Sequence, residues 1–218
     1  MIIHTYECLE STQTFLLQGL KSGTLQAPIC INAHRQTHGI GSRGNTWEEQ
    51  PRAIYFSFAL PLSALPQDLK IESASIYFGF LCKETLKSFG SKVWLKWPND
   101  LYIGHQKIGG VLCNKWQEYL ICGIGINLYT KGNNSAPYAT LEPEISARIE
   151  TMDFLQRYFI SVEKKISWKQ IFRFYALEFQ NNFDFDFHHN GKKVSFKEAK
   201  LLEDGAICVD SQIVYSCR

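Results

Sequence analysis

One stretch of the chain constrains the fold more than any other, because it packs three short apolar runs close together. The runs are residues 93–97, 108–114 and 118–123, and each is too short for a typical helix. Turn-forming pairs, Asn-Asp at 99–100 and Gly-His at 104–105, lie between the first two runs. Strands joined by such short turns pair antiparallel. The stretch therefore predicts an antiparallel meander.

The rest of the first 180 residues mixes strand and helix patterns. Ser11 and Thr12 precede a short apolar run, so they are predicted to form the N-cap of a helix. A segment rich in Gly, Asn and Pro, residues 130–143, is predicted to be a loop. Apolar periodicity predicts strands at 1–8, 28–34 and 53–60, and helices at 69–89, 149–166 and 168–179. The predicted class is α+β, a mixed or antiparallel sheet with flanking helices.

The pattern changes near residue 181. Phe183, Phe185 and Phe187 alternate with polar residues, and Asn190-Gly191 is a hairpin signal. Short strands there offer too little core to be stable alone. We therefore predict two domains: a main body, residues 1–180, and a small C-terminal β-barrel, residues 181–218, packed against it.

Composition excludes several classes of protein. The chain has 218 residues, of which 45% are hydrophobic and 20% charged, as in an ordinary globular protein. A net charge of +2 gives no reason to expect DNA binding. The longest apolar stretch is too short to span a membrane, and the first residues do not resemble a signal peptide. Seven cysteines without CxxC spacing argue against a zinc site and favour a reducing, cytoplasmic location.

A glycine-rich loop spans residues 36–47. Gly39, Gly41 and Gly44 would let backbone amides approach a ligand, and Arg43 adds positive charge. No Gly-Lys-Ser/Thr follows, so it is not a Walker loop, and Trp47 stands where a dinucleotide-binding helix would begin. By itself the loop is compatible with an ordinary surface connection, and Trp47 with either a core residue or a stacking wall.

The turn at residues 99–100 is more informative. Pro98 excludes a continuing central strand, so Asn99 and Asp100 are held in a turn at the end of the sheet. The following hairpin folds Lys107 back beside them. The alternative interpretation is a simple hairpin with a solvated lysine.

Two glycine-rich strands follow this turn. Gly109-Gly110 leaves one strand surface bare, and residues 123–127, Gly-Ile-Gly-Ile-Asn, repeat the pattern and end in an amide. Three such features at successive strand ends predict the floor of a ligand site.

These blocks together resemble those of the biotin–protein ligases. The blocks, in the order of that family, are Ser11-Thr12, residues 36–47, Lys96-Trp97-Pro98-Asn99-Asp100, Lys107-Ile108-Gly109-Gly110-Val111-Leu112, and residues 123–127. The resemblance covers residues 1–145 and continues weakly to the end. It implies the biotin–lipoate ligase fold, which is like that of class II aminoacyl-tRNA synthetases, with an SH3-like C-terminal barrel and no DNA-binding domain.

The resemblance also implies a two-step reaction. Biotin and ATP give biotinyl-5′-AMP and pyrophosphate, and a lysine of a biotin carboxyl carrier protein then takes the biotinyl group. Mg²⁺ would accompany ATP, with Asp100 as a candidate ligand. A homodimer is possible, because relatives often pair through an edge strand.

The residue roles follow by resemblance. Lys107 and Arg43 are the candidate catalytic residues, with Lys107 bridging the biotin carboxylate and the α-phosphate. The candidate biotin-binding residues are Ser11, Thr12, Gln36, Gly39, Gly41, Trp47, Lys107 and Gly110. The candidate nucleotide-binding residues are Arg43, Trp47, Asn99, Asp100, Lys107, Asn127, Tyr138 and Arg218.

The glycine-rich loop departs from the family pattern Gly-Arg-Gly-Arg-x-Gly. Ile40 and Ser42 occupy both arginine positions, and Arg43 is the remaining cation of the loop. We expect Arg43 to substitute only partially, so that the adenylate is retained less firmly than in typical relatives.

Three alternatives remain open at this point. A lipoate or octanoyl transferase could share the fold, although the Trp-Pro-Asn-Asp block argues against it. A non-catalytic module that binds biotin or the carrier is a second alternative, against which Lys107 argues. A biotin-responsive DNA repressor would need a DNA-binding domain ahead of the main body, and we expect none.

Overall fold

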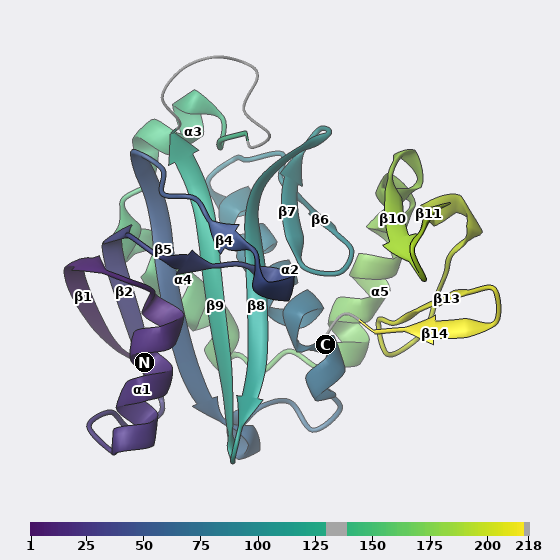
Figure 1. Cartoon of the computed structure of the whole chain (residues 1–218). Helices are drawn as coiled ribbons and strands as arrows, with labels where there is room; N and C mark the ends of the chain where they lie inside the picture. The colour runs from purple at the N-terminus through teal and green to yellow at the C-terminus, as the bar shows by residue number, and fades with distance from the viewer. Residues whose placement is uncertain (130–138, 216–218) are drawn as a thin grey trace.

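The central element is a mixed seven-stranded sheet (Figure 1). The computed structural model describes residues 1–129 and 139–215, with only the backbone of Arg43. The two strands nearest the N-terminus, Ile2–Leu9 and Ile29–Gln36, pair in parallel, and every other neighbouring pair in this sheet is antiparallel. In spatial order the strands are β1 (Ile2–Leu9), β2 (Ile29–Gln36), β5 (Arg52–Pro61), β9 (Tyr119–Tyr129), β8 (Gln106–Trp116), β7 (Asp100–Ile103) and β6 (Trp94–Lys96). The α+β prediction is confirmed.

The predicted meander corresponds to β6-β7-β8-β9, in which each strand pairs with the next. Two details differ from the prediction. The strand β7 has only four residues between two turns, too few for its alternation to be recognised. The strand β9 continues to Tyr129 because its glycines pair in register with β5 and β8 instead of ending the strand.

Three helices form the larger core with the sheet. Two of them, α2 (Ala74–Ser88) and α4 (Thr151–Glu163), lie behind one face of the sheet, and α5 (Trp168–Glu178) packs beside α2 and the edge strand β6 (Figure 1). Phe56 and Phe58 of β5 pack edge-on against Tyr158 and Phe159 of α4. Each large apolar side chain buried in this way contributes about 1.5–3 kcal/mol to folding. All three helices were predicted, with ends displaced by a few residues.

The helix α1 (Thr12–Ser22) lies on the opposite face, over a smaller apolar cluster (Figure 1). Ser11 is its N-cap, and the Ser11 hydroxyl accepts a hydrogen bond from the Thr14 amide. Gly23 ends the helix at φ 74°, a left-handed conformation that favours glycine. The predicted N-cap is confirmed at Ser11, and Thr12 is the first residue of the helix.

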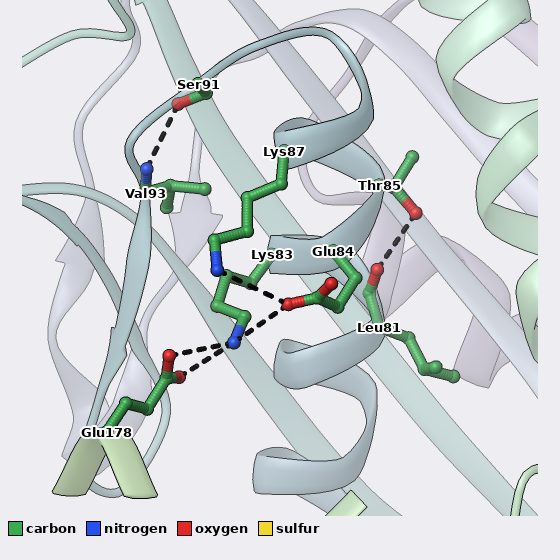
Figure 2. A network of polar contacts seen from close by, with 8 residues as sticks. All are labelled: Leu81, Lys83, Glu84, Thr85, Lys87, Ser91, Val93 and Glu178. Atoms are coloured by element: carbon green, nitrogen blue, oxygen red, sulfur yellow. Dashed lines mark hydrogen bonds and ion pairs between the residues drawn. The ribbon is translucent and has the colours of Figure 1, made fainter. Parts of the chain in front are cut away.

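A buried ion pair joins α2 to α5 (Figure 2). Lys83 is 2% exposed, and its Nζ lies 2.9 Å from both carboxylate oxygens of Glu178 and 3.0 Å from Glu84 Oε1. Burying an ammonium is costly unless it is paired and hydrogen-bonded, as it is here. The contact fixes α5, from which the chain continues into the C-terminal module.

The glycine-rich loop contains a small hairpin that crosses the front of the sheet (Figure 1). Its strands are β3 (Gly39–Ile40) and β4 (Thr46–Trp47), and a 3-10 turn, Ser42–Gly44, joins them. Sequence periodicity could not reveal strands of two residues. The helix α3 (Pro143–Arg148) was also missed, because its first residue was assigned to the predicted loop. Residues 130–138 of that loop lie outside the described part of the chain.

The C-terminal module, residues 181–215 in the structure, consists of two small sheets. The predicted hairpin is present, with Asn190 at φ 50° and Gly191 at φ 76° in its turn. Phe196, Ile207 and Val209 belong to the larger core, so the module packs on the main body as expected. The strands are β10 (Asp186–His189) and β11 (Lys192–Ser195), then β12 (Lys200–Leu201), β13 (Ile207–Val209) and β14 (Gln212–Val214). The remaining 3-10 turns are Leu62–Ala64, Ile71–Ser73, Phe179–Asp184 and Phe196–Glu198.

None of the helices in residues 1–129 and 139–215 combines the length and apolar character needed to cross a membrane. The domain boundary at residue 180 stays a prediction.

Candidate active site

A cavity of about 340 Å³ opens on the face of the sheet that carries α1 and the β3–β4 hairpin. Gly39 belongs to the hairpin itself, where it packs against Trp47 and Gln36, and it does not line the cavity. Tyr138, Arg218 and the Arg43 side chain lie outside the described part of the structure. The other predicted residues all line this cavity: Ser11, Thr12, Gln36, Gly41, Trp47, Asn99, Asp100, Lys107, Gly110 and Asn127. Residues from the N-terminal helix and from five strands therefore converge on one space.

One end of the cavity is a buried hydrogen-bond network. The Thr12 amide and hydroxyl both donate to Gln36 Oε1, at 2.7 and 3.0 Å. The Thr12 hydrogen is used in this way, so the 2.8 Å contact between Thr12 Oγ1 and Ser57 Oγ is donated by Ser57. Gln36 Oε1 thus has both acceptor positions filled, which fixes the orientation of its amide. Sequence reasoning missed Ser57 because it lies inside a continuous apolar strand.

Gln13 is the more important omission. Its side chain is 9% exposed and lines the cavity, yet neither Oε1 nor Nε2 has a hydrogen-bond partner among the described residues. A side chain at Gly123 would collide with Gln13 Oε1, so that glycine makes room for the amide. Burying an unpaired amide costs free energy, so such a group needs an explanation. A side chain that forms its hydrogen bonds with a bound ligand is one such explanation. In the sequence, its position directly after Ser11-Thr12, two candidate biotin-binding residues, was the feature that could have indicated a binding role.

The two bare glycine strands support the indole of Trp47. A Cβ at Gly125 would lie 2.9 Å from Trp47 Cε2, and one at Gly110 would lie 3.4 Å from Cζ3. What rests on these strands in the structure is the protein's own ring, and their role as the floor of a ligand site stays a prediction. Trp47 borders the cavity, so its interpretation as a wall is preferred over a core residue. Its buried Nε1 has no hydrogen-bond partner in residues 1–129 and 139–215.

A β-bulge between β7 and β8 aims Lys107 into the cavity. Leu101 pairs with Gly109 but Tyr102 pairs with Lys107, so Ile108 has no partner in β7. Ile108 is fully buried in the core behind the sheet. In a regular ladder Lys107 would point to that side, and the extra residue turns it to the cavity side. Gly109 is required at the bulge, because a Cβ there would lie 2.7 Å from the Gly125 carbonyl oxygen.

Lys107 faces an acid and an aromatic ring. Its Nζ lies 2.7 Å from Asp100 Oδ1 and 5.5 Å from the ring centre of Trp47. The turn that presents Asp100 is fastened to β8 by a reciprocal pair of bonds. Asn99 Nδ2 donates to the Val111 carbonyl at 2.7 Å, and the Val111 amide donates to the Asn99 carbonyl at 2.8 Å. The predicted proximity of this turn to Lys107 is correct.

Asn127 lies near the far end of β9. Its Nδ2 donates weakly to the Ala139 carbonyl at 3.4 Å, and its buried Oδ1 accepts no hydrogen bond from any described residue. The backbone nearby is firmly connected, since Ala139 donates to the Lys107 carbonyl and Leu141 to the Asn127 carbonyl. The amide is thus held at the cavity wall with acceptor capacity left over.

The described part of the site offers neither a metal cluster nor a thiol nucleophile. No group of three His, Cys, Asp or Glu side chains gathers there, so a metal ion would have to bring most of its ligands with it. Behind the floor, burial raises the pKa of Cys122, and burial likewise raises the pKa of Cys30 and Cys82, so these thiols stay protonated. No disulfide joins any of the six cysteines that the structure describes.

Residues 5–127, more than half of the chain, match the biotin/lipoate A/B protein ligase family. The chain belongs to this family. Among curated members, Escherichia coli bifunctional ligase/repressor BirA is 31% identical over 127 residues, which is 55% of this chain and 38% of BirA. Mycobacterium tuberculosis biotin–[acetyl-CoA-carboxylase] ligase is 26% identical over 137 residues, 60% of this chain and 50% of the relative. The matched region thus spans about half or less of these ligases.

Solved structures of the biotin/lipoate ligase family extend the similarity to nearly the whole chain. Biotin acetyl coenzyme A carboxylase synthetase from Helicobacter pylori, with bound biotinylated ATP, is 44% identical with a TM-score of 0.90, covering 98% of each chain. Biotin protein ligase from Aquifex aeolicus, in complex with biotin and ATP, has a TM-score of 0.77 at 23% identity, covering 98% of this chain and 94% of that one. The second comparison supports the fold alone. Together they confirm the predicted biotin–lipoate ligase architecture.

Proposed function

We propose that this chain is a biotin–protein ligase, which activates biotin as biotinyl-5′-AMP and transfers it to a lysine of a carrier protein. The observation that carries the proposal is the position of Lys107. Its ammonium is turned into a cavity whose opposite end is a cluster of buried amides and hydroxyls. The names of the similar proteins, which include biotin ligases, support it.

The polar end of the cavity suits the ureido ring of biotin. That ring has one carbonyl acceptor and two N–H donors, and burying it costs free energy unless each is matched. Ser11, Thr12 and Gln36 are the proposed partners, and the unpaired amide of Gln13 supplies a further donor and acceptor. The dithiolane of lipoate or the alkyl chain of octanoate would leave these groups unpaired. The site therefore favours biotin over the related acids.

Lys107 is proposed to act where negative charge gathers. The biotin carboxylate attacks the α-phosphorus of ATP, an O–P bond forms, and the bond to pyrophosphate breaks. A fixed ammonium between the carboxylate and the phosphate offsets their repulsion and stabilises the transition state. The carrier lysine, after losing a proton to solvent, attacks the acyl carbon, and AMP leaves with the electrons of the C–O bond. The same ammonium can stabilise the departing phosphate.

The nucleotide is proposed to lie beside Trp47 and Asn127. The spare acceptor of Asn127 fits the exocyclic amine of adenine, and the Trp47 ring offers a flat surface. Magnesium fits this site as an ion bound by the nucleotide phosphates, whose charge it would help neutralise. Asp100 is the proposed protein ligand, although its Oδ1 is paired with Lys107. The remaining candidates keep the roles proposed from the sequence. Biotin binding is proposed for Gly39, Gly41 and Gly110, nucleotide binding for Asn99, Tyr138 and Arg218, and both catalysis and nucleotide binding for Arg43.

The partner is proposed to be a biotin carboxyl carrier protein in the cytoplasm. The protonated, buried thiols are compatible with a reducing compartment. A homodimer that pairs edge strands, and a separate C-terminal barrel from residue 181, also remain proposals.

The experiment that tests the proposal uses labelled biotin, Mg²⁺-ATP and a carrier domain. The expected result is labelled carrier that depends on ATP, with lipoate and octanoate in excess failing to compete. Adenylate formed without transfer would mean that the carrier is the wrong one or that coupling is impaired. Binding of biotin without adenylate would overturn the proposal in favour of a non-catalytic module.

A further inference from the structure

Trp97 ties the C-terminal module to the main body next to the active site. The residue is 2% exposed and precedes the turn that holds Asn99 and Asp100. Its indole Nε1 donates to the Gly205 carbonyl at 2.8 Å, and its backbone amide donates to Asn182 Oδ1 at 2.8 Å. Both partners lie beyond residue 180, so the module holds Trp97 by its side chain and by its backbone.

Asn182 is itself rigidly placed. It is fully buried, and its Nδ2 donates to the Phe179 carbonyl at 2.8 Å, so the amide cannot rotate without leaving a buried group unpaired. Phe187 and Phe196 pack on the Trp97 ring, with ring centres 6.2 and 5.9 Å away. Trp97 therefore has little freedom to move independently of the module.

The contacts continue from Trp97 to the catalytic candidate. Two residues later, Asn99 makes its reciprocal bonds with Val111, and Asp100 binds the Lys107 ammonium at 2.7 Å. A second cavity of about 310 Å³ runs along this path, bordered by Asp100 and Lys107 on one side and by Phe187 and His188 of the module on the other. The module thus borders the same residues that it holds in place.

We propose that the C-terminal module takes part in adenylation by positioning: through Asn182 and Trp97 it fixes the Asn99–Asp100 turn, and thereby the ammonium of Lys107. The inference rests on the proposed function and assigns Trp97 and Asn182 as positioning residues. Neither needs to touch a substrate. A displacement of the reacting groups by about 1 Å can cost a hundredfold in rate, so a small shift of this turn is sufficient.

The chain offers a matched control for the module's attachment. Trp168 of α5 is also buried, and its indole Nε1 donates to the Glu203 carbonyl at 2.8 Å. Trp97 and Trp168 therefore hold the same short segment, two residues apart, with the same kind of bond. Only Trp97 is connected to the turn beside Lys107. Replacing either by Phe removes one indole N–H and keeps an aromatic ring.

The experiment compares Trp97→Phe with Trp168→Phe in the full chain. It measures thermal unfolding, the dissociation constant of biotin alone, and kcat and KM for ATP-dependent adenylate formation. We expect similar losses of stability in both variants and a change in biotin affinity far smaller than the change in kcat, because the ureido end is built from α1 and β2. We expect kcat for adenylation to fall at least about tenfold in Trp97→Phe alone.

Equal effects of the two variants on kcat would overturn the inference and indicate a general loss of attachment. An unaltered kcat in Trp97→Phe would overturn it as well. If Trp97→Phe does not fold, Asn182→Ser provides the same test, because it removes the acceptor of the Trp97 backbone bond. Failure of the wild-type chain to form any adenylate would instead contradict the proposed function, so the two failures are distinguishable.

Discussion

Lys107 Nζ and Asp100 Oδ1 lie 2.7 Å apart on the cavity side of the sheet, although the two residues come from different strands. In the absence of substrates, the Asp100 carboxylate balances the charge of the half-buried Lys107 ammonium. It also means that substrates must compete with Asp100 for the lysine or share it. The chemistry of the site is therefore prepared by charge pairing before any ligand binds.

Removing the ammonium is expected to abolish most adenylation. Lys107→Gln should lose about 3 kcal/mol of transition-state stabilisation, a factor of about one hundred in kcat/KM, because one fixed charge contact is lost. Pyrophosphate exchange measures this directly. Lys115→Gln, an exposed lysine of the same strand, is the control and should behave as wild type. Near-normal turnover in Lys107→Gln would show that the lysine has been misassigned.

Replacing the unpaired amide of Gln13 is expected to raise the stability of the fold while lowering the affinity for biotin. Gln13→Met removes a buried amide without a partner in the described structure, so the melting temperature should rise. Biotin affinity should fall by about 1–3 kcal/mol, because the ureido group loses a partner. Gln36→Met is the contrasting variant, since its Oε1 accepts two bonds from Thr12, and it should lose both stability and affinity. Calorimetry with biotin alone and thermal unfolding test both; unaltered binding in Gln13→Met would exclude Gln13 from the site.

The two glycines beneath the Trp47 ring, Gly110 and Gly125, are expected to tolerate replacement by alanine to different degrees. A Cβ at Gly125 would lie 2.9 Å from the indole of Trp47, whereas one at Gly110 would make an ordinary 3.4 Å contact. Gly125→Ala should therefore displace the ring and raise KM for ATP about tenfold, an effect of about 1.4 kcal/mol. Gly110→Ala should change it much less. Tryptophan fluorescence reports the displacement independently, and equal behaviour of the two variants would contradict this account of the floor.

Restoring the loop cations is expected to slow the loss of the intermediate. With Ile40 and Ser42 in place of two arginines, the loop has fewer charges to hold a phosphate. The double variant Ile40→Arg with Ser42→Arg should release biotinyl-5′-AMP more slowly than the wild type. Stopped-flow measurement of adenylate release decides the matter, with Ile40→Gln and Ser42→Gln as a neutral control. Release that is no slower in the arginine variant would refute the proposed role of the loop.

The sequence predicts the fold and most of the site because both depend on local signals. Strand runs, turn residues and the cap at Ser11 specify their own neighbourhoods, and the spacing of Asn99, Asp100 and Lys107 within one hairpin brings them together. Contacts across the fold were not predictable in this way. The resting place of Trp47 on Gly125 joins residues 78 positions apart.

Gln13 and Ser57 were not predicted as site residues for a related reason. Each looks ordinary in its own segment, one as a polar residue of a helix and the other as a small residue of an apolar strand. Their importance comes from burial beside a cavity, which depends on how α1 is placed over β5 and β9. Pairing of distant segments, not local propensity, determines such features.

The bulge at Ile108 places two consecutive residues, Ile108 and Gly109, on the interior side of β8. Deleting Ile108 would therefore restore a regular ladder in which Lys107 still pairs with Tyr102 and still faces the cavity. The shortened chain would lose a fully buried side chain, and with it stability, but would keep its reactive nitrogen in place. Inserting one residue between Lys107 and Ile108 would do the opposite, because it would leave the buried side chain where it is and turn the lysine toward the apolar interior.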